Sequence, residues 1–217
     1  MVGTDTLITW LGHASFKIEA DDKIIYIDPY EGDYQEKADF ILVTHCHHDH
    51  CDVAKIAEAR KESSVVVAPS DCALKIGGTV ESLQPGERLT VEGITIEAVD
   101  AYNYKRFRSP GTPFHPEGSG VGYLVTVKGK TIYHAGDTDL VPGMKGLKDV
   151  YVALLPAGDT YTMDNPEAAE AALAIKPVYA IPMHRLDTDP TEFKKMVESR
   201  SSTRVILLKP GERFEVE

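Results

Sequence analysis

The sequence has little positive charge and no long apolar run. Its 217 residues include 34 acidic side chains against 23 basic ones, a formal net charge of −11. A chain this acidic repels phosphate backbones, which argues against nucleic acid as a general partner. No stretch approaches the ~18 apolar residues of a membrane span, and the opening MVGTDTLITWLG lacks the features of a signal peptide. We therefore expect a cytoplasmic protein with no membrane partner.

Cysteine is scarce, with three residues in the chain. An odd number without paired spacing argues against a disulfide framework. Cys46 and Cys51 flank a group of histidines and could be metal ligands. The alternation of an extended chain turns Cys46 away from its histidine neighbours, however, which favours small buried residues for both.

The chain does have the material for an ordered core. Hydrophobic residues make up 42% of it and charged residues 26%, proportions typical of a folded globular protein. The length fits one domain over residues 1–217, or two fused halves that share a core.

A dense group of metal-binding side chains follows a short apolar run. Residues 40–43 (FILV) have the pattern of a buried strand. Directly after it come four potential ligands, namely His45, His47, Asp49 and His50. Alternation places the first two histidines on the same side of an extended backbone. Imidazole and carboxylate ligands suit zinc, manganese, iron or nickel.

The order of elements repeats along the chain. Residues 15–29 and 38–45 have the pattern of a hairpin, a polar strand end and a buried strand, and residues 122–138 and 150–158 repeat it. This predicts an α/β fold with a duplicated unit, two sheets face to face and helices outside. Helices are expected from Asp52, Ser70, Asp164 and Asp189, each of which can cap a helix.

The later strand ends add ligands to the first group. His134 and Asp137 follow one strand, and His184 follows another. His115 lies in residues 101–120, a segment rich in proline, glycine and aromatic residues that we interpret as a functional loop or lid. These residues suffice for two metal ions, which at ~3.5–4 Å from each other would supply a bridging hydroxide near neutral pH.

Three motifs carry a family resemblance. THCHHDH, followed by HAGDT and IPMH, resembles the metallo-β-lactamase superfamily. The opening TWLGHASFKIE, the IDP at residues 27–29 and the late YTM resemble its branch of small metal-dependent hydrolases. That branch includes the ascorbate-6-phosphate lactonase relatives (UPF0173-type) and, more distantly, N-acyl-phosphatidylethanolamine phospholipase D and tRNase Z. The resemblance implies a four-layer αββα sandwich, the metallo-β-lactamase fold, built from two similar halves.

The resemblance also implies a ligand set for two divalent ions, with zinc favoured and manganese or nickel as alternatives. The first ion would be held by His45, His47 and a third histidine, and the second by Asp49, His50 and His184, with Asp137 bridging. Because His47 stands where the diiron branch has an acidic residue, a redox iron pair is less expected.

Two residues are candidates for the third histidine of the first metal site. Some relatives carry it near the position of Asn103, which is a poor zinc ligand. His115 resembles the histidine before the Gly-Tyr strand of tRNase Z and is favoured. His134 is the alternative, and otherwise has a catalytic role in moving protons.

Other side chains are expected around the metals. Asp28 is expected to support the ligand loop, with a plain strand-end cap as the alternative, and His13 to touch substrate or metal, with a core histidine as the alternative. Lys105, Arg106 and Arg108 form a basic cluster in the lid, and Arg185 follows His184. Guanidinium groups suit phosphate or carboxylate, which predicts a small anionic substrate. The alternative is that the lid contacts a second copy of the chain.

The predicted activity is hydrolysis of a small anionic ester, lactone or phosphodiester. In this scheme Asp49 orients the attacking hydroxide, and His134, Tyr161 or water protonates the leaving group. The competing hypotheses are an RNA-processing phosphodiesterase, disfavoured by the acidic charge, and a non-catalytic metal-binding protein, disfavoured by the intact ligand set.

Overall fold

Two β-sheets carry the fold, each in its own part of the chain. The computed structural model describes residues 6–217. Residues 1–5, which belong to the opening segment predicted to lack a signal peptide, lie outside the described residues. Unit 1 comprises residues 6–83 with Leu208–Glu217, and unit 2 comprises Gln84–Leu207. Among the described residues, no helix is both long and apolar enough to cross a bilayer.

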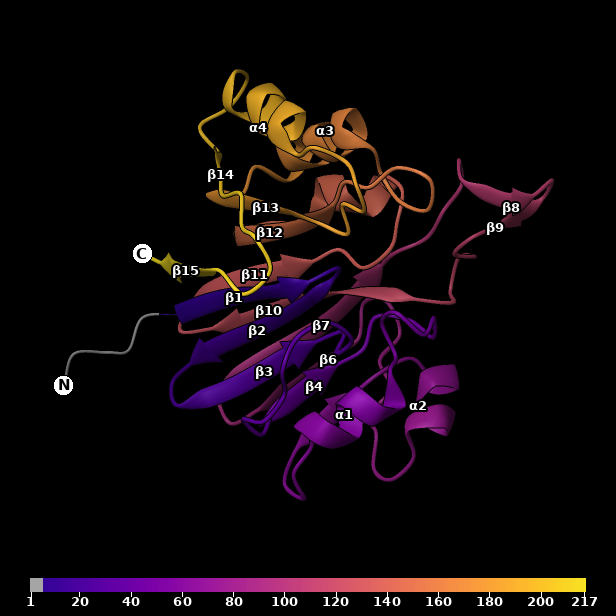
Figure 1. The fold of residues 1–217 in the computed structure, drawn as a ribbon, viewed down its shortest axis with the longest axis vertical. Coiled ribbons are helices and arrows are strands. Elements are labelled where there is room, and N and C mark those ends of the chain that lie inside the picture. The colour runs from indigo at the N-terminus through magenta and orange to yellow at the C-terminus, as the bar shows by residue number, and fades with distance from the viewer. Residues whose placement is uncertain (1–5) are drawn as a thin grey trace. The chain divides into compact units, whose positions relative to one another are not determined.

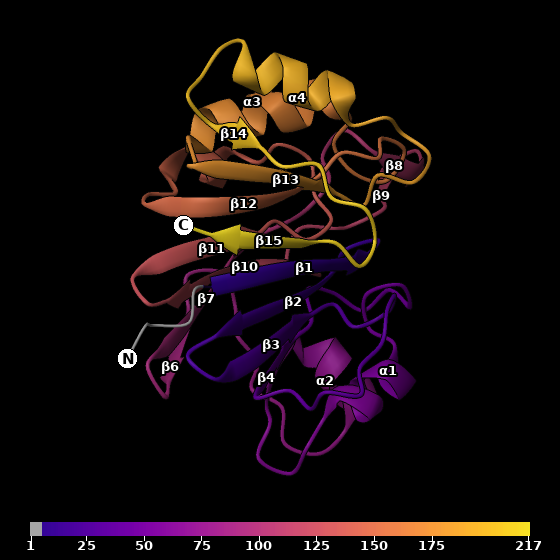
Figure 2. The same ribbon diagram turned by 60° about the vertical axis from the view of Figure 1, so that its left-hand side comes forward.

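Unit 1 contains a six-stranded sheet in the order β15-β1-β2-β3-β4-β5, and Figure 2 shows β15, β1, β2, β3 and β4 in this succession. Its strands are β1 (Thr6–Gly12), β2 (Ser15–Ala20), β3 (Lys23–Ile27), β4 (Phe40–Leu42), β5 (Val65–Val67) and β15 (Arg213–Val216). The strands from β15 to β3 are antiparallel, whereas β3, β4 and β5 run parallel. The parallel strands end at the same edge of the sheet, and the ligand loop begins there.

Two short helices of unit 1 lie beside β3 and β4 (Figure 1). Helix α1 (Val53–Ala59) begins after Asp52, whose side chain accepts two backbone N–H groups, as predicted. Helix α2 (Ser70–Ile76) corrects a prediction: Ser70 is its first residue, and Pro69 occupies the N-cap position without a side-chain hydrogen bond. The buried side chains between this face of the sheet and the helices include Tyr26, Tyr34, Ile41, Val43, Cys51, Ile56, Val66 and Cys72.

Unit 2 contains a seven-stranded sheet in the order β14-β13-β12-β11-β10-β7-β6. Its strands are β6 (Arg88–Val91), β7 (Ile94–Asp100), β10 (Val121–Val127), β11 (Lys130–His134), β12 (Val150–Pro156), β13 (Tyr179–Met183) and β14 (Arg204–Val205). The β10–β11 pair is antiparallel and the β11–β12 pair is parallel. Because β2–β3 and β3–β4 pair in the same way, the predicted repetition of the two halves is confirmed.

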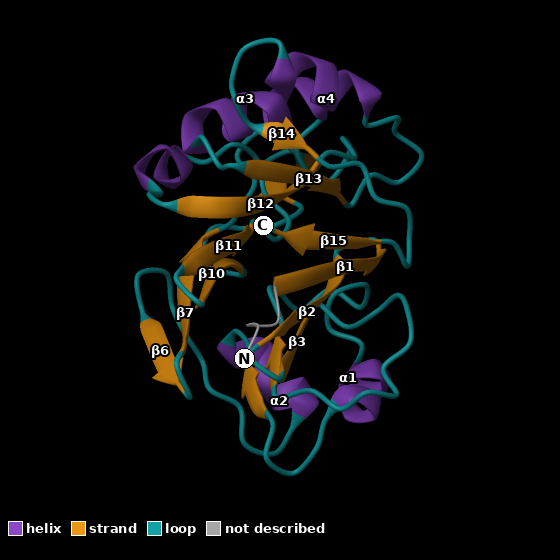
Figure 3. Ribbon diagram, turned by 90° about the vertical axis from the view of Figure 1, so that its left-hand side faces the viewer, coloured by secondary structure: helices purple, strands orange, loops and turns teal. Residues whose placement is uncertain are grey.

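Helices α3 (Asn165–Ile175) and α4 (Thr191–Glu198) lie beside β12 to β14 in unit 2 (Figure 3). Asp164 caps α3 as predicted, by accepting the N–H of Glu167 at 2.8 Å. The predicted cap of α4 needs correction, because Pro190 occupies its N-cap position, although Asp189 still accepts the N–H of Thr191 at 3.0 Å. A 3₁₀ helix, η1 (Pro142–Gly146), packs against α3.

The proposed lid has more regular structure than its composition predicts. Strands β8 (Phe107–Ser109) and β9 (Thr112–Pro113) form a small antiparallel hairpin inside residues 101–120. The hairpin is largely exposed, and Figure 1 shows it extending from the rest of unit 2.

Phe193 tests how much the packing of α4 stabilises unit 2. Its side chain is fully buried in the apolar cluster that contains Ala168, Ala172 and Val197. We expect Phe193→Ala to lower the free energy of unfolding by about 3–5 kcal/mol, because it removes a buried ring and leaves a cavity. Urea denaturation followed by circular dichroism measures this loss. Phe107→Ala is the matched control, since Phe107 is 45% exposed and should change stability by less than about 0.5 kcal/mol; equal losses would contradict the assignment.

Candidate metal centre

One buried carboxylate holds both ends of the ligand loop in unit 1. Asp28 follows β3 and is fully buried. Its Oδ1 accepts the N–H of Thr44 at 2.7 Å, and its Oδ2 accepts the Thr44 hydroxyl at 2.7 Å and Nδ1 of His50 at 2.8 Å. Because a carboxylate only accepts, Nδ1 of His50 carries the proton and Nε2 keeps the lone pair. This pairing is typical of histidines that bind metals.

The first two histidines of the loop turn their ring nitrogens toward each other. Nε2 of His45 lies 3.0 Å from Nδ1 of His47. The Thr44 hydroxyl donates to Asp28, so it accepts Nδ1–H of His45 at 3.0 Å and leaves the lone pair on Nε2. Two nitrogens that each lie ~2.0–2.1 Å from one zinc ion are about 3.3 Å apart in tetrahedral geometry. The donor set and its spacing therefore fit a shared metal ion.

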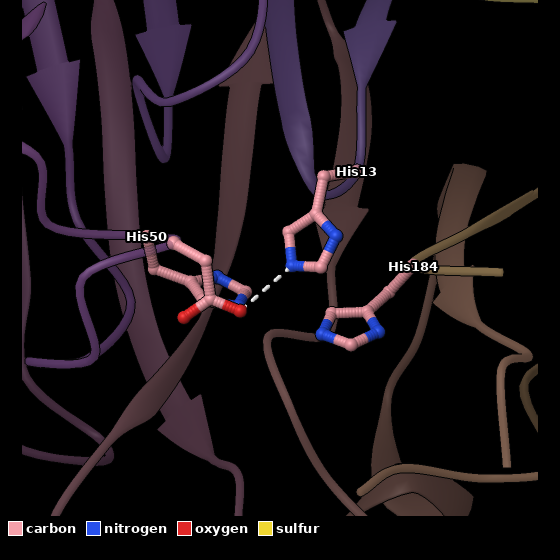
Figure 4. Close-up of side chains that lie close together, drawn as sticks. His13, His50 and His184 are labelled. Atoms are coloured by element: carbon pink, nitrogen blue, oxygen red, sulfur yellow. Dashed lines mark hydrogen bonds and ion pairs between the residues drawn. The ribbon is translucent and has the colours of Figure 1, made fainter. Parts of the chain in front are cut away.

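His13 contacts the carboxylate of the same loop. Its Nε2 lies 3.0 Å from Oδ2 of Asp49, the contact marked by the dashed line in Figure 4. The same Asp49 oxygen lies 3.9 Å from Nε2 of His50, and the His13 and His50 rings are 5.3 Å apart. His13 has a positive φ of 48° directly after Gly12, so the turn between β1 and β2 directs its ring toward Asp49.

Unit 2 brings a carboxylate between two imidazoles. Oδ2 of Asp137 lies 3.1 Å from Nε2 of His184 and 3.3 Å from Nε2 of His115. All three side chains are buried. Gly158 permits the local path of the chain, because a Cβ there would lie 2.1 Å from the backbone oxygen of His184. This arrangement can supply one bridging oxygen and two nitrogen ligands.

Asn103 sets the orientation of His115. Its Oδ1 lies 2.7 Å from Nδ1 of His115, and its Nδ2 donates to Asp139 and to the backbone oxygen of Tyr161, both at 3.1 Å. The two donor contacts fix the amide orientation, so Nδ1 of His115 is the donor and Nε2 keeps the lone pair. Asn103, near which the family resemblance predicts a ligand in some relatives, contacts the candidate ligand His115 through this hydrogen bond.

His134 ends β11 and is fully buried. Its Nδ1 accepts the N–H of Gly136 at 3.2 Å. Because Nδ1 accepts this N–H, Nε2 of the neutral His134 ring carries the proton. His115 instead keeps the lone pair on Nε2, so the geometry within unit 2 favours His115 as the candidate ligand.

A partly buried ion-pair network holds the base of the lid. Nη1 of Arg106 lies 2.6 Å from Asp139 and 2.6 Å from Glu167, and Lys105 lies 2.9 Å from Glu167. Asp139 also accepts the N–H groups of Tyr104 and Lys105 at 2.8 and 2.7 Å. Arg106, predicted to bind substrate, is thus held by two carboxylates, and this geometry favours a role in anchoring the lid.

The other two arginines expected to bind substrate differ in their surroundings. Arg108 is exposed on the β8–β9 hairpin, with its guanidinium 5.9 Å from the centre of the Phe114 ring. Arg185 follows His184 and is half-buried; burial lowers its pKa, and the nearby Asp189 partly opposes this.

Sequence reasoning missed several supporting residues. Asp139, Glu167 and Thr44 have no role in the predictions made from the sequence. Asp139 lies inside the GDTD run that contains Asp137, and this proximity was the available signal. Glu167 had none, because its partners are about 60 residues away in the sequence.

The fold and these candidate ligands together point to the class of protein. Residues 7–184 match the family described as the Beta-lactamase superfamily domain. A crystal structure of a protein from Parabacteroides distasonis is 35% identical to this chain, with a TM-score of 0.85 over 92% of both chains. The structure of a metallo hydrolase from Ignicoccus hospitalis is 28% identical, with a TM-score of 0.80 over 99% of this chain and 100% of that one. The chain therefore has the metallo-β-lactamase fold, as predicted.

The relatives narrow the assignment further. A UPF0173 metal-dependent hydrolase of Methanosarcina barkeri is 35% identical over 234 residues and spans 100% of both proteins. A second, of Methanopyrus kandleri, is 36% identical over 229 residues and spans 96% of this chain and 99% of that protein. The chain belongs to the UPF0173 metal-dependent hydrolase family, which confirms the predicted resemblance.

The lid anchor has a measurable pH signature. Burial alone would raise the pKa of Glu167, but its contacts with Lys105, Arg106 and the N–H of Leu140 outweigh this, and the pKa lies below its ordinary 4.5. A lowered folded-state pKa contributes stability above the unfolded value and loses it as pH falls through the folded value. We therefore expect Glu167→Gln to cost about 1.5–3 kcal/mol at pH 7 and to lose less stability than wild type below pH ~4.5.

Urea unfolding at pH 7 and at several acidic values measures both effects. Glu170→Gln is the control, because Glu170 is 48% exposed and pairs at the surface with Arg200. Parallel acid profiles for wild type and Glu167→Gln would contradict the expected role of Glu167.

Proposed function

We propose that this protein is a hydrolase that uses two divalent metal ions, zinc in preference to manganese or nickel, to cleave a small anionic substrate. The observation that carries the proposal is the position of the Asp137 carboxylate, whose one oxygen lies within 3.3 Å of nitrogens on both His115 and His184. A carboxylate flanked by two imidazoles is suited to bridge two ions. Membership in a family of metal-dependent hydrolases supports the same conclusion.

Each unit contributes part of the proposed ligand set. The first ion would be held by His45, His47 and His115, and the second by Asp49, His50 and His184, with Asp137 shared. The tautomers support this assignment, since Nδ1 donates in His45, His50 and His115 and leaves Nε2 for the metal. The combination of the two sets into one centre rests on the sequence motifs and the family. The zinc content of ligand variants tests it.

The chemistry divides between the ions and the side chains. When bound, two such ions lower the pKa of a water molecule and stabilise negative charge that develops on the substrate. Asp49, held at 3.0 Å by His13, can accept a hydrogen bond from the attacking water and orient it. His134 and Tyr161 are the candidates to return a proton to the leaving group.

The preference for an anion rests chiefly on Arg108, which is exposed on the lid hairpin. Lys105 and Arg106 are paired with carboxylates of unit 2, and Arg108 and Arg185 are the proposed contacts with the anion. Arg108 is exposed on the lid hairpin, and a guanidinium stacked on an aromatic ring can still bind phosphate or carboxylate in the plane of its N–H groups. Phosphodiesters, and esters or lactones that carry a phosphate or carboxylate group, fit this description.

Metal analysis with matched variants tests the centre. We expect wild-type protein to hold two more equivalents of zinc than a His45→Ala/His184→Ala variant, which lacks one ligand for each ion. His115→Ala should weaken zinc binding at least about tenfold, whereas His134→Gln should not, because only His115 is proposed as a ligand. Equilibrium dialysis with elemental analysis gives both quantities.

Turnover is measured on the same samples with bis-p-nitrophenyl phosphate, a panel of lactones and a short RNA. Hydrolysis of RNA alone would favour a phosphodiesterase that processes nucleic acid. Full zinc loading without turnover of any compound would overturn the proposal in favour of a non-catalytic metal-binding protein.

Arg108→Ala tests the substrate class. We expect KM for anionic esters to rise about tenfold while KM for neutral esters stays unchanged, because one charge-assisted contact contributes about 1.5 kcal/mol. Arg88→Ala is the control, since Arg88 is exposed and pairs with Glu97 on β7. An equal change for both ester types, with a shift in sedimentation, would instead support a lid that contacts a second copy of the chain.

A further inference from the structure

The three cysteines of the chain lie together in unit 1. Cys46 lies in the ligand loop after β4, Cys51 directly precedes the cap of α1, and Cys72 is in the first turn of α2. Their sulfur atoms all lie within 4.8 Å of one another. The sequence predicts small buried residues at positions 46 and 51. Cys51 is buried, as is Cys72, whereas Cys46 is only partly buried.

The parallel pairing of β4 with β5 produces this meeting. The N–H of Val43 donates to the oxygen of Val67 at 2.9 Å, so the chain leaves both strands at the same edge. The segment after β4 carries Cys46, and the segment after β5 leads into α2 and Cys72. Residues separated by 26 positions in the sequence are therefore neighbours in space.

The sulfur spacing fits one metal ion. Three sulfurs that each lie ~2.3 Å from an ion are separated by about 3.8 Å in tetrahedral and about 4.0 Å in trigonal geometry. Both separations are compatible with the three sulfur atoms, which lie within 4.8 Å of one another. Thiolate ligands select soft ions such as zinc and monovalent copper.

The surroundings supply access and a compensating charge. Cys46 is partly exposed, whereas the other two sulfurs are enclosed by the apolar side chains between the sheet and the helices. The ammonium group of Lys75 donates to the backbone oxygen of Cys46 at 3.0 Å. A positive charge at this position offsets part of the negative charge of three thiolates.

We propose that Cys46, Cys51 and Cys72 bind one soft d¹⁰ metal ion, zinc or monovalent copper, separate from the histidine and aspartate ligands. The ion fastens the ligand loop to α2 at two points, since Cys46 lies between His45 and His47 and Cys51 follows His50. Any small apolar side chains could fill this part of the core. A metal site instead requires three sulfur atoms close to one another, and these three lie within 4.8 Å of each other. The proposal goes beyond the hydrolase activity and does not depend on it.

Cadmium, a d¹⁰ probe of sulfur ligands, tests the site. Chelator-treated protein kept under reductant is titrated with Cd²⁺, and the sulfur-to-cadmium charge-transfer absorption should rise to the amplitude of one sulfur-bound ion per chain. The same absorption should appear in the His45→Ala/His184→Ala variant, because imidazole and carboxylate ligands do not produce it. Failure of the hydrolase proposal therefore leaves this result unchanged.

Cysteine variants give the decisive comparison. Cys72→Ala and Cys46→Ala should each reduce the absorption by at least half and weaken zinc and monovalent copper binding at the site at least about tenfold, measured against chromophoric chelators. Cys46 is partly exposed, so Cys46→Ala should fold normally and keeps the test valid even if Cys72→Ala misfolds. Leu74→Ala on α2 is the control, since Leu74 is 88% exposed and has no sulfur.

Two results would overturn the proposal. One is wild-type protein without charge-transfer absorption on addition of Cd²⁺. The other is Cys46→Ala and Cys72→Ala variants that keep the full absorption and the wild-type affinity for both ions.

Discussion

The hydrogen bonds of one buried carboxylate organise the ligand loop of unit 1. Asp28 accepts from the backbone and hydroxyl of Thr44 and from the imidazole of His50. The same hydroxyl then accepts from His45, so a single anion determines the tautomers of two histidines through a chain of donors. A buried carboxylate without these donors would cost several kcal/mol, so the loop conformation and the burial of Asp28 depend on each other.

Unit 2 also contains a buried carboxylate that orients a histidine through a chain of hydrogen bonds. Asp139 is a fully buried carboxylate that accepts from two backbone N–H groups, from Arg106 and from Asn103. Asn103 passes the orientation on to His115. Candidate ligands in each unit, namely His45, His50 and His115, are therefore oriented by hydrogen bonds inside that unit, which would reduce the reorganisation needed when metal binds.

The lid illustrates a limit of interpreting charge from sequence. Its basic cluster resembles an anion site when read along the chain, yet two of its three cations are neutralised by carboxylates that the fold brings to them. Arg108 differs because the β8–β9 hairpin carries it away from those carboxylates. The net charge of −11 also counts carboxylates that have partners inside the fold. Asp28, Asp139 and Glu167 each accept hydrogen bonds that offset their negative charge.

The sequence by itself determined the repeated halves, the strands that end in ligands and the metal-binding chemistry, because alternation, turn residues and ligand types are local properties of the chain. It could not show which ring nitrogens of His115 and His134 accept or donate hydrogen bonds, identify Asn103 and Asp139 as supports, or bring Cys72 to Cys46 and Cys51. Those outcomes depend on where a long loop returns and which strands run parallel. Only tertiary structure decides such contacts, since residues far apart in the sequence meet only when whole sheets have formed.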